Sequence, residues 1–249
     1  MIDNSNILQL ITICLRLSNI IGLMSLIIAK YYLPDFLRYG KTFTSAKNGN
    51  EKIWDKIKNF SVPKSYFAHF YILSSVLALV TLASYPTDIL VWQLFLHSSR
   101  RLYETLYISK YTEKSKMNWS HYAVGLWFYS QLNILVYLRV QRENTTARVL
   151  PILVMVLASW DQYKNHVVLS KLKKYSLPRS RLFELVCCPH YLDEMIIYGS
   201  LVSYGHEFVW PLIWVIASLS ISALESRKFY LSKFKDTEVP RYAAIPYIL

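Results

Sequence analysis

The stretch that decides the fold is residues 7–29, ILQLITICLRLSNIIGLMSLIIA, in which Arg16 is the single charged side chain. As an α-helix it is roughly 34 Å long, which is enough to cross the hydrocarbon of a bilayer. Three further runs, 67–84, 122–138 and 208–224, contain no charged residue. Because lipid offers the backbone no hydrogen-bond partner, such runs are expected to form membrane-spanning helices.

Working outward from these runs predicts an all-α fold, a polytopic membrane helix bundle with about seven transmembrane helices in one domain, residues 1–249. The expected spans are 7–29, 66–85, 88–109, 120–139, 148–170, 190–205 and 207–226. Asp3 and no Lys or Arg precedes the first span, whose apolar run is longer than that of a signal peptide. We therefore expect it to be retained as a helix.

The formal net charge of +12 could indicate nucleic acid, so the distribution of the charges has to decide. Of the 28 lysines and arginines, 21 lie in the segments 30–64, 110–116, 171–181 and 227–241, which seven spans place on one side of the membrane. The other side keeps only three, all within 139–148. This asymmetry predicts a cytoplasmic carboxyl terminus. The basic residues are scattered over short loops, so we expect no nucleic-acid partner.

Two glycosylation sequons begin at Asn118 and Asn144. The predicted topology puts Asn118 on the cytoplasmic side and Asn144 on the lumenal side. A glycan is therefore expected only at Asn144, if at either site.

Polar side chains interrupt three of the weaker spans. They form three clusters: His97, Arg100, Arg101 and Glu104; the run 161–166, DQYKNH; and His190 with Glu194. On a helix His97, Arg101 and Glu104 lie within about 60° of one another. Gln162, His166 and Lys173 likewise share one stripe.

Two interpretations of these clusters are open. In the first, Arg100 and Glu104 form an interfacial ion pair, and lysines such as Lys173 extend to lipid headgroups. In the second, the clusters line one water-accessible pocket at the cytoplasmic side, because ionisable groups within a membrane usually mark a site. Arg101 and Lys173 would then suit phosphates, and Glu194 an amide or a ribose hydroxyl, a pattern that fits a dinucleotide.

Several sequence motifs are missing. The sequence has no GxGxxG and no GxxxxGK[ST], so any nucleotide must be held by side chains between helices. It has no GxSxG or HExxH, which disfavours a hydrolase. Cys14, Cys187 and Cys188 have no CxxC spacing, and the six histidines lack ligand spacing, so no metal is expected.

The carboxyl-terminal half of the sequence resembles the steroid 5α-reductase family of membrane-bound, NADPH-dependent reductases. The similar segments are QYKNH at 162–166 with Leu169 and Leu172-Lys173, the run from Leu177-Pro178 through LFELV at 182–186 and PHYL at 189–192 to Glu194, and the tail from SRKFY at 226–230 through Lys233-Phe234 and Pro240-Arg241 to AIP at 244–246. HSSRRLYE at 97–104 and VPKSYFAHFY at 62–71 are similar to the polyprenal (polyprenol) reductase branch. The resemblance covers roughly residues 60–249.

Carried onto matching positions, the resemblance implies an NADPH site. The residues that it implies as contacts of the cofactor are Arg101, Gln162, His166, Lys173, His190, Glu194 and Tyr230. The sequence also departs from the family pattern. Arg227 stands where a histidine is usual, Lys173 replaces an arginine, and the tyrosine that assists reduction in steroid-reducing members falls on Ser98. These departures argue against a steroid ketone as substrate.

The implied reaction is reduction of the α-isoprene double bond of polyprenal, giving dolichal, in dolichol synthesis for protein N-glycosylation at the endoplasmic reticulum membrane. Hydride adds to the β-carbon of an α,β-unsaturated aldehyde because the charge then moves to oxygen. We expect Tyr66 or His69 to donate the hydrogen bond to that oxygen. Both could equally belong to an interfacial aromatic belt. The partners would be a long-chain polyisoprenoid and membrane lipid.

Rival hypotheses come from other classes of protein. An isoprenylcysteine methyltransferase-like enzyme would share the helix bundle and a similar His…Glu end region but use S-adenosylmethionine. A transporter or receptor would explain the spans but not the carboxyl-terminal motifs.

Overall fold

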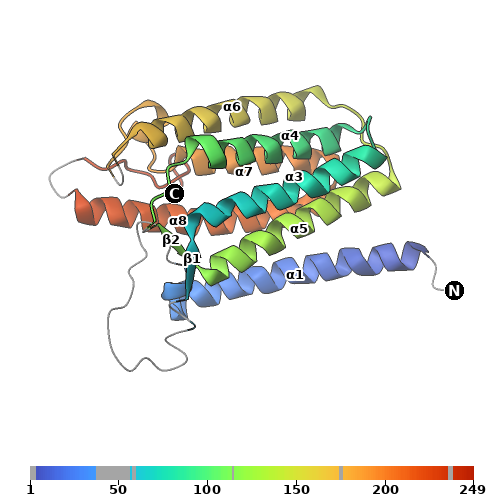
Figure 1. Cartoon of the computed structure of the whole chain (residues 1–249), viewed down its shortest axis with the longest axis horizontal. Helices are drawn as coiled ribbons and strands as arrows, with labels where there is room; N and C mark the ends of the chain where they lie inside the picture. Colours follow the sequence, from blue (N-terminus) through green and yellow to red (C-terminus); the bar gives the residue numbers. More distant parts are fainter. Residues whose placement is uncertain (1–3, 38–56, 58–59, 114, 174–175, 235–237) are drawn as a thin grey trace.

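The structure, a computed structural model, describes residues 4–37, 57, 60–113, 115–173, 176–234 and 238–249. Within this part of the chain, seven long helices form a bundle (Figure 1). Their bounds are α1 Asn4–Tyr32, α3 Phe67–Ser84, α4 Ile89–Tyr103, α5 Trp119–Arg142, α6 Val149–Lys171, α7 Pro189–Leu201 and α8 Val209–Lys233. A π-helical turn, Glu104–Ile108, continues α4. The predicted all-α membrane bundle is confirmed.

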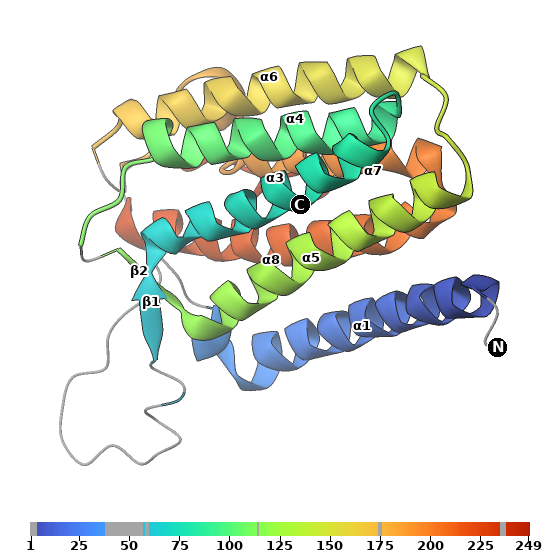
Figure 2. The same ribbon diagram turned by 45° about the vertical axis from the view of Figure 1, so that its right-hand side comes forward.

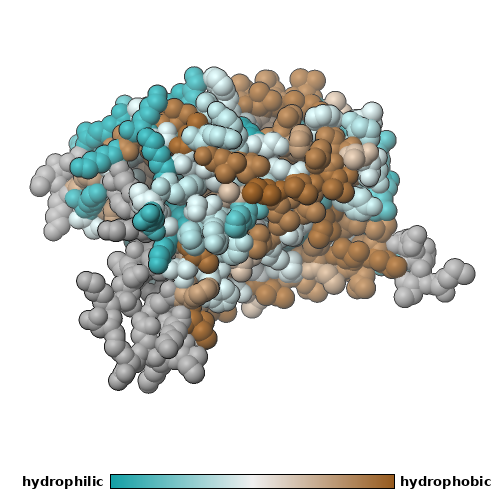
Figure 3. All heavy atoms as spheres, viewed as in Figure 1, coloured by the Kyte–Doolittle hydropathy of each residue, from teal (hydrophilic) through white to brown (hydrophobic). Residues whose placement is uncertain are grey.

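Three helical stretches are long and apolar enough to cross a membrane by length and composition: Asn6–Tyr32, Lys64–Ser84 and His206–Lys233. Each coincides with a predicted span. Figure 3 shows hydrophobic residues over the centre and right of one face and hydrophilic residues gathered at the upper left. The apolar surface is therefore concentrated along the helices, where the bundle would meet lipid.

In the part of the chain that the structure describes, the basic segments follow the carboxyl ends of α1, α6 and α8, which lie at one end of the bundle. The carboxyl terminus lies at this end, together with the short antiparallel strands β1, Ser61–Pro63, and β2, Lys116–Asn118 (Figure 1). The links from α3 to α4 and from α5 to α6 lie at the opposite end, where α1 begins. The start of α1 and the carboxyl terminus therefore lie at opposite ends of the bundle, as seven spans require.

Local capping explains where several helices begin. Asp88 is the N-cap of α4, and its Oδ1 accepts the Leu90 amide at 2.9 Å. Its Oδ2 also accepts the Thr145 amide at 2.7 Å, which ties the α3–α4 link to the α5–α6 link. Asn118 caps α5 by accepting the Ser120 amide at 3.0 Å. This sequon asparagine is also fully buried.

The helices pack in a layered order. Figure 2 shows α4 running alongside both α3 and α6, and α3 packs on α5 while α7 packs on α6 and α8. At Gly125 of α5, an added Cβ would lie only 2.5 Å from the ring of Phe70 on α3. This close approach of two helices requires glycine at that position, as is common where helices pack in membranes. The peripheral helix α1 rests mainly on α8 and α5.

Candidate cofactor-binding site

The polar side chains of α4, α6 and α7 converge inside the bundle, at its basic end. Arg101 of α4 is the centre of this polar network: its guanidinium pairs with Glu104 and lies 2.9 Å from His166 Nδ1 on α6. Its Nη2 donates to the Tyr71 hydroxyl on α3 at 2.9 Å. One arginine therefore connects three helices.

Glu104 is the anionic partner in this network and is 0% exposed. It pairs with both Arg100 and Arg101, and its Oε2 lies 2.6 Å from His166 Nδ1. Glu104 is also the first residue of the π-helical turn, and such turns occur often at functional sites. The two arginines offset the cost of burying this carboxylate.

Gln162 links the other half of the network. Its Oε1 accepts from Arg100 Nη2 at 2.6 Å, and its Nε2 donates to the His190 carbonyl at 3.0 Å and to the Glu194 carboxylate. Glu194 also lies 3.6 Å from His97 Nε2. The rings of His166 and His190 are 5.5 Å apart. Gln162 thus joins α4, α6 and α7 through one amide.

The structure therefore brings together five of the seven predicted cofactor contacts: Arg101, Gln162, His166, His190 and Glu194. The prediction of an Arg100–Glu104 ion pair also corresponds to a contact. Glu104 is fully buried, so the pair lies inside the protein and not on its surface.

Lys173 and Tyr230 lie apart from this network. Helix α6 ends at Lys171, so the stripe that joins Gln162 and His166 does not extend to Lys173, which is exposed. Tyr230 of α8 is 6% exposed and packs in a second cluster with Cys187 and Cys188.

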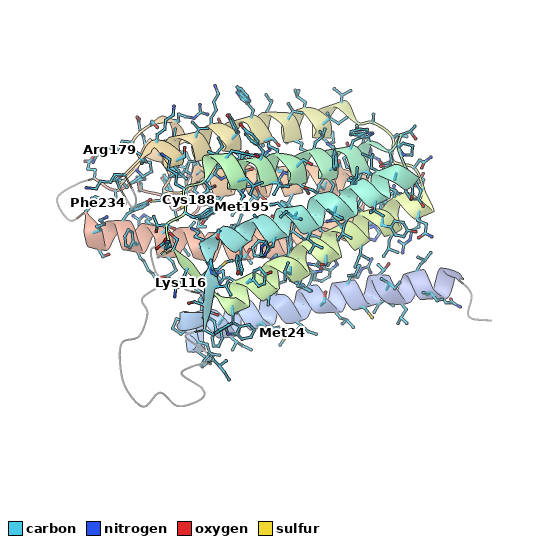
Figure 4. The ribbon with its side chains drawn as sticks, viewed as in Figure 1. Met24, Lys116, Arg179, Cys188, Met195 and Phe234 are labelled. Carbon is cyan, nitrogen blue, oxygen red and sulfur yellow. The ribbon has the colours of Figure 1, made fainter. Side chains whose placement is uncertain are left out.

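The carboxyl-terminal tail completes this second cluster. The amides of Cys187 and Cys188 donate to the carbonyls of Tyr242 and Ala243, both at 2.9 Å. Figure 4 shows Cys188 and Phe234 at the same end of the bundle as Arg179. Since Cys188 directly precedes α7, the tail and Tyr230 border the start of the helix that carries His190.

Tyr66 and His69 form a separate aromatic group at the beginning of α3. Their rings stack at 4.5 Å, and His69 Nδ1 lies 3.0 Å from the Tyr122 hydroxyl on α5. Both are exposed. Tyr71 is two residues beyond His69 and therefore points about 200° away around the helix, toward Arg101. The structure does not bring Tyr66 or His69 to the polar network.

Tyr71 is the member of the network that sequence reasoning missed. It lies in the charge-free run 67–84, where nothing in the sequence distinguishes a tyrosine that contacts a polar group from one that packs in an apolar helix. Sequence reasoning also missed two hydrogen bonds of Asn165, which donates to Asp193 at 2.8 Å and to Asp161 at 3.1 Å. Asn165 lies four residues from Asp161, the spacing that could have indicated this contact.

Comparisons with known proteins show the family of the chain. Residues 123–249, about half of the chain, match the family described as 3-oxo-5-alpha-steroid 4-dehydrogenase. A protein of Saccharomyces cerevisiae named polyprenal reductase is 52% identical over 250 residues, which cover 99% of each chain. The chain belongs to the steroid 5α-reductase family. Proteins named polyprenal reductase from Homo sapiens and Drosophila melanogaster are each 28% identical, covering 86% and 92% of this chain and 85% and 88% of their own.

Members of the steroid 5α-reductase family are oxidoreductases that act on carbon–carbon double bonds, so this chain is a membrane-bound oxidoreductase of that kind. The resemblance inferred from the motifs is confirmed. The methyltransferase-like, transporter and receptor hypotheses are set aside, because they do not predict membership of this family.

Reductases of the steroid 5α-reductase family generally use NADPH, and the polar network fits such a cofactor. The Nε atoms of Arg100 and Arg101 are buried without a hydrogen-bond partner, so both guanidiniums keep a donor for an anionic group. The Glu194 carboxylate supplies the acceptor that an amide or a sugar hydroxyl requires. Among the described residues, no group of three His, Cys, Asp or Glu side chains is placed to hold a metal ion.

Proposed function

We propose that this chain is a polyprenal reductase: with NADPH it reduces the α-isoprene double bond of polyprenal to dolichal, in dolichol synthesis for protein N-glycosylation. The observation that carries the proposal is the 52% identity, over 99% of both chains, to the yeast protein of that name. The buried arginine and glutamate network inside an apolar bundle supports it, because a cofactor and a lipid would meet there.

The proposed cofactor contacts are those of the polar network. Arg100 and Arg101 would hold the phosphates through charge-assisted hydrogen bonds, which suit the planar guanidinium. Glu194 and Gln162, which contact each other, would receive the amide or ribose end. NADPH supplies a hydride when it is bound. Both arginines pair with Glu104, while Glu194 lies beside His97, so two guanidiniums share one directly paired carboxylate.

Lys173 and Tyr230 stay predictions as cofactor contacts. Lys173 is exposed at the basic end, where it could reach only an outer part of the cofactor. Tyr230 borders the start of α7 through the cluster with Cys187 and Cys188. Both positions would suit a long ligand that extends from the network toward the carboxyl-terminal tail.

The substrate would approach from lipid. A long isoprenoid tail is best left in the bilayer, so only the polar head and the conjugated double bond have to enter the bundle. The apolar surface along the helices is compatible with such lateral access (Figure 3). The aldehyde polarises the adjacent double bond, and so prepares it to accept a hydride.

Tyr66 and His69 stay candidates for the hydrogen bond to the substrate oxygen. Their stacked rings lie at the start of α3, on the side that faces Tyr122. If they act on the oxygen, Tyr66→Phe and His69→Ala should each lower turnover at saturating NADPH. Full turnover in both variants would remove them from the reaction.

The decisive experiment uses the purified full chain in detergent with NADPH and either polyprenal or polyprenol. We expect NADPH to raise the thermal unfolding temperature, S-adenosylmethionine to leave it unchanged, and polyprenal to be converted to dolichal. Conversion of neither lipid by protein that binds NADPH would contradict the proposed substrate.

We further propose that the protein lies in the endoplasmic reticulum membrane with its carboxyl terminus in the cytoplasm. The gathering of the basic segments at one end of the bundle supports this orientation. In sealed microsomes, a carboxyl-terminal epitope should be cut by added protease without detergent. Protection of the epitope would reverse the orientation.

A further inference from the structure

Tyr71 has surroundings unlike those of the other tyrosines near the site. It lies on α3, is 5% exposed and reaches Arg101, whose Nη2 is 2.9 Å from its hydroxyl. The guanidinium also lies over the Tyr71 ring, 5.0 Å from its centroid. A cation thus contacts both the oxygen and the ring of one buried phenol.

The direction of the hydrogen bond between these two groups is fixed by chemistry. A guanidinium can only donate, so the Tyr71 oxygen accepts from Arg101, and the phenolic hydrogen remains available. In the part of the chain that the structure describes, this is the one hydrogen bond that Tyr71 makes. The buried side chain therefore has a donor to spare.

Neighbouring tyrosines lack this combination. Tyr129 of α5 packs edge-on against Tyr71 with ring centroids 5.2 Å apart, but Arg101 donates no hydrogen bond to it. Tyr66 is 38% exposed and stacks on His69. Of these three tyrosines, Tyr71 alone joins burial to direct contact with a cation.

We propose that Tyr71 is a catalytic residue that donates its phenolic proton to the substrate aldehyde oxygen during reduction. This inference rests on the proposed function. When a hydride adds to the β-carbon, the electrons of the double bond would shift toward the carbonyl and charge would develop on its oxygen, which Tyr71 would protonate. Transfer of the Tyr71 proton converts that oxygen to an enol hydroxyl.

The proton count closes with one proton from the solvent. The phenolate left on Tyr71 is stabilised by the Arg101 hydrogen bond and by its positive charge at close range. The enol becomes the saturated aldehyde when the α-carbon takes a proton from water and the hydroxyl proton returns to Tyr71. Overall, one hydride and one proton from water are consumed, and Tyr71 is restored.

The test compares two single-atom deletions on packed rings, Tyr71→Phe and Tyr129→Phe, in the purified full chain. For Tyr71→Phe we expect kcat with polyprenal to fall by about 100-fold or more, the usual contribution of a general acid. NADPH affinity, measured by fluorescence titration without substrate, should stay within about threefold of the parent. Tyr129→Phe should stay within about threefold of the parent in both measurements.

Three outcomes would overturn the assignment: a Tyr71→Phe enzyme as fast as the parent, an equal loss in Tyr129→Phe, or a loss of turnover matched by a loss of NADPH affinity. The last would mean that Tyr71 only positions Arg101 for the cofactor. Activity of the parent separates this proposal from the proposed function. A parent that binds NADPH but reduces no polyprenal overturns both, whereas an active parent with an equally active Tyr71→Phe overturns only the role of Tyr71.

Discussion

Two of the places where the described helices bury polar side chains against one another do so in opposite ways. Between α1 and α5, Asn19 and Gln131 exchange amide hydrogen bonds of 2.7 and 3.1 Å, and both are almost fully buried. In the network around Arg101, the buried groups are charged, and the Nε atoms of both arginines have no hydrogen-bond partner.

The difference separates a contact that holds helices together from one that can receive a ligand. A reciprocal amide pair is neutral and satisfies its own donors and acceptors, so it favours one helix register and offers little else. Buried charges with donors to spare are costly unless another group completes them. We therefore expect substitutions in the Arg101 network to affect the cofactor, and substitutions in the amide pair to affect only stability.

The largest effect should come from Glu104→Ala. This change leaves Arg100 and Arg101 buried without their carboxylate, and breaking a buried ion pair from one side costs about 3–5 kcal/mol. We expect a large loss of thermal stability together with loss of NADPH binding. Glu104→Gln keeps the volume and serves as the control. If both variants bind NADPH normally, the network has no part in the cofactor site.

Arg101→Ala and Glu194→Ala should weaken NADPH binding by about tenfold or more, as expected for hydrogen bonds to charged groups. Fluorescence titration with NADPH measures the effect, and Arg101→Lys shows whether the planar guanidinium is needed. Unchanged affinity in Arg101→Ala and Glu194→Ala would refute these two assignments.

Asn19→Leu tests the neutral amide pair between α1 and α5. It strands the Gln131 amide, which should lower stability by roughly 1 kcal/mol, within the range of interhelical hydrogen bonds in membranes. The double variant Asn19→Leu with Gln131→Leu should recover most of that loss because no buried amide remains unpaired. NADPH affinity should not change in either. A cofactor defect here would erase the distinction between the two regions.

Lys173→Ala should have the smallest effect. The side chain is exposed beyond the end of α6, where solvent screens its charge, so NADPH affinity should fall by only about twofold to threefold. A loss as large as that in Arg101→Ala would mean that Lys173 moves onto the cofactor when it binds.

Much of the site could be predicted from sequence because helix periodicity places residues on faces. Gln162 and His166, four residues apart, do meet α4 together, through Arg100 and Arg101. The same reasoning failed at Lys173 because a periodic stripe holds only while the helix lasts, and α6 ends at Lys171. Helix periodicity also gave no reason to expect that Tyr230 would lie apart from Arg101.

By itself the sequence determined the helices, the end of the bundle that carries the basic residues, and the polar positions that cannot face lipid. Hydropathy and charge can be read from each segment by itself, and the bilayer sets the same requirements for every membrane-spanning segment. Only the tertiary structure decided which faces meet. The rotation of α3 that turns Tyr71 toward Arg101 and leaves His69 on Tyr122 depends on packing against α4 and α5, which no single helix encodes.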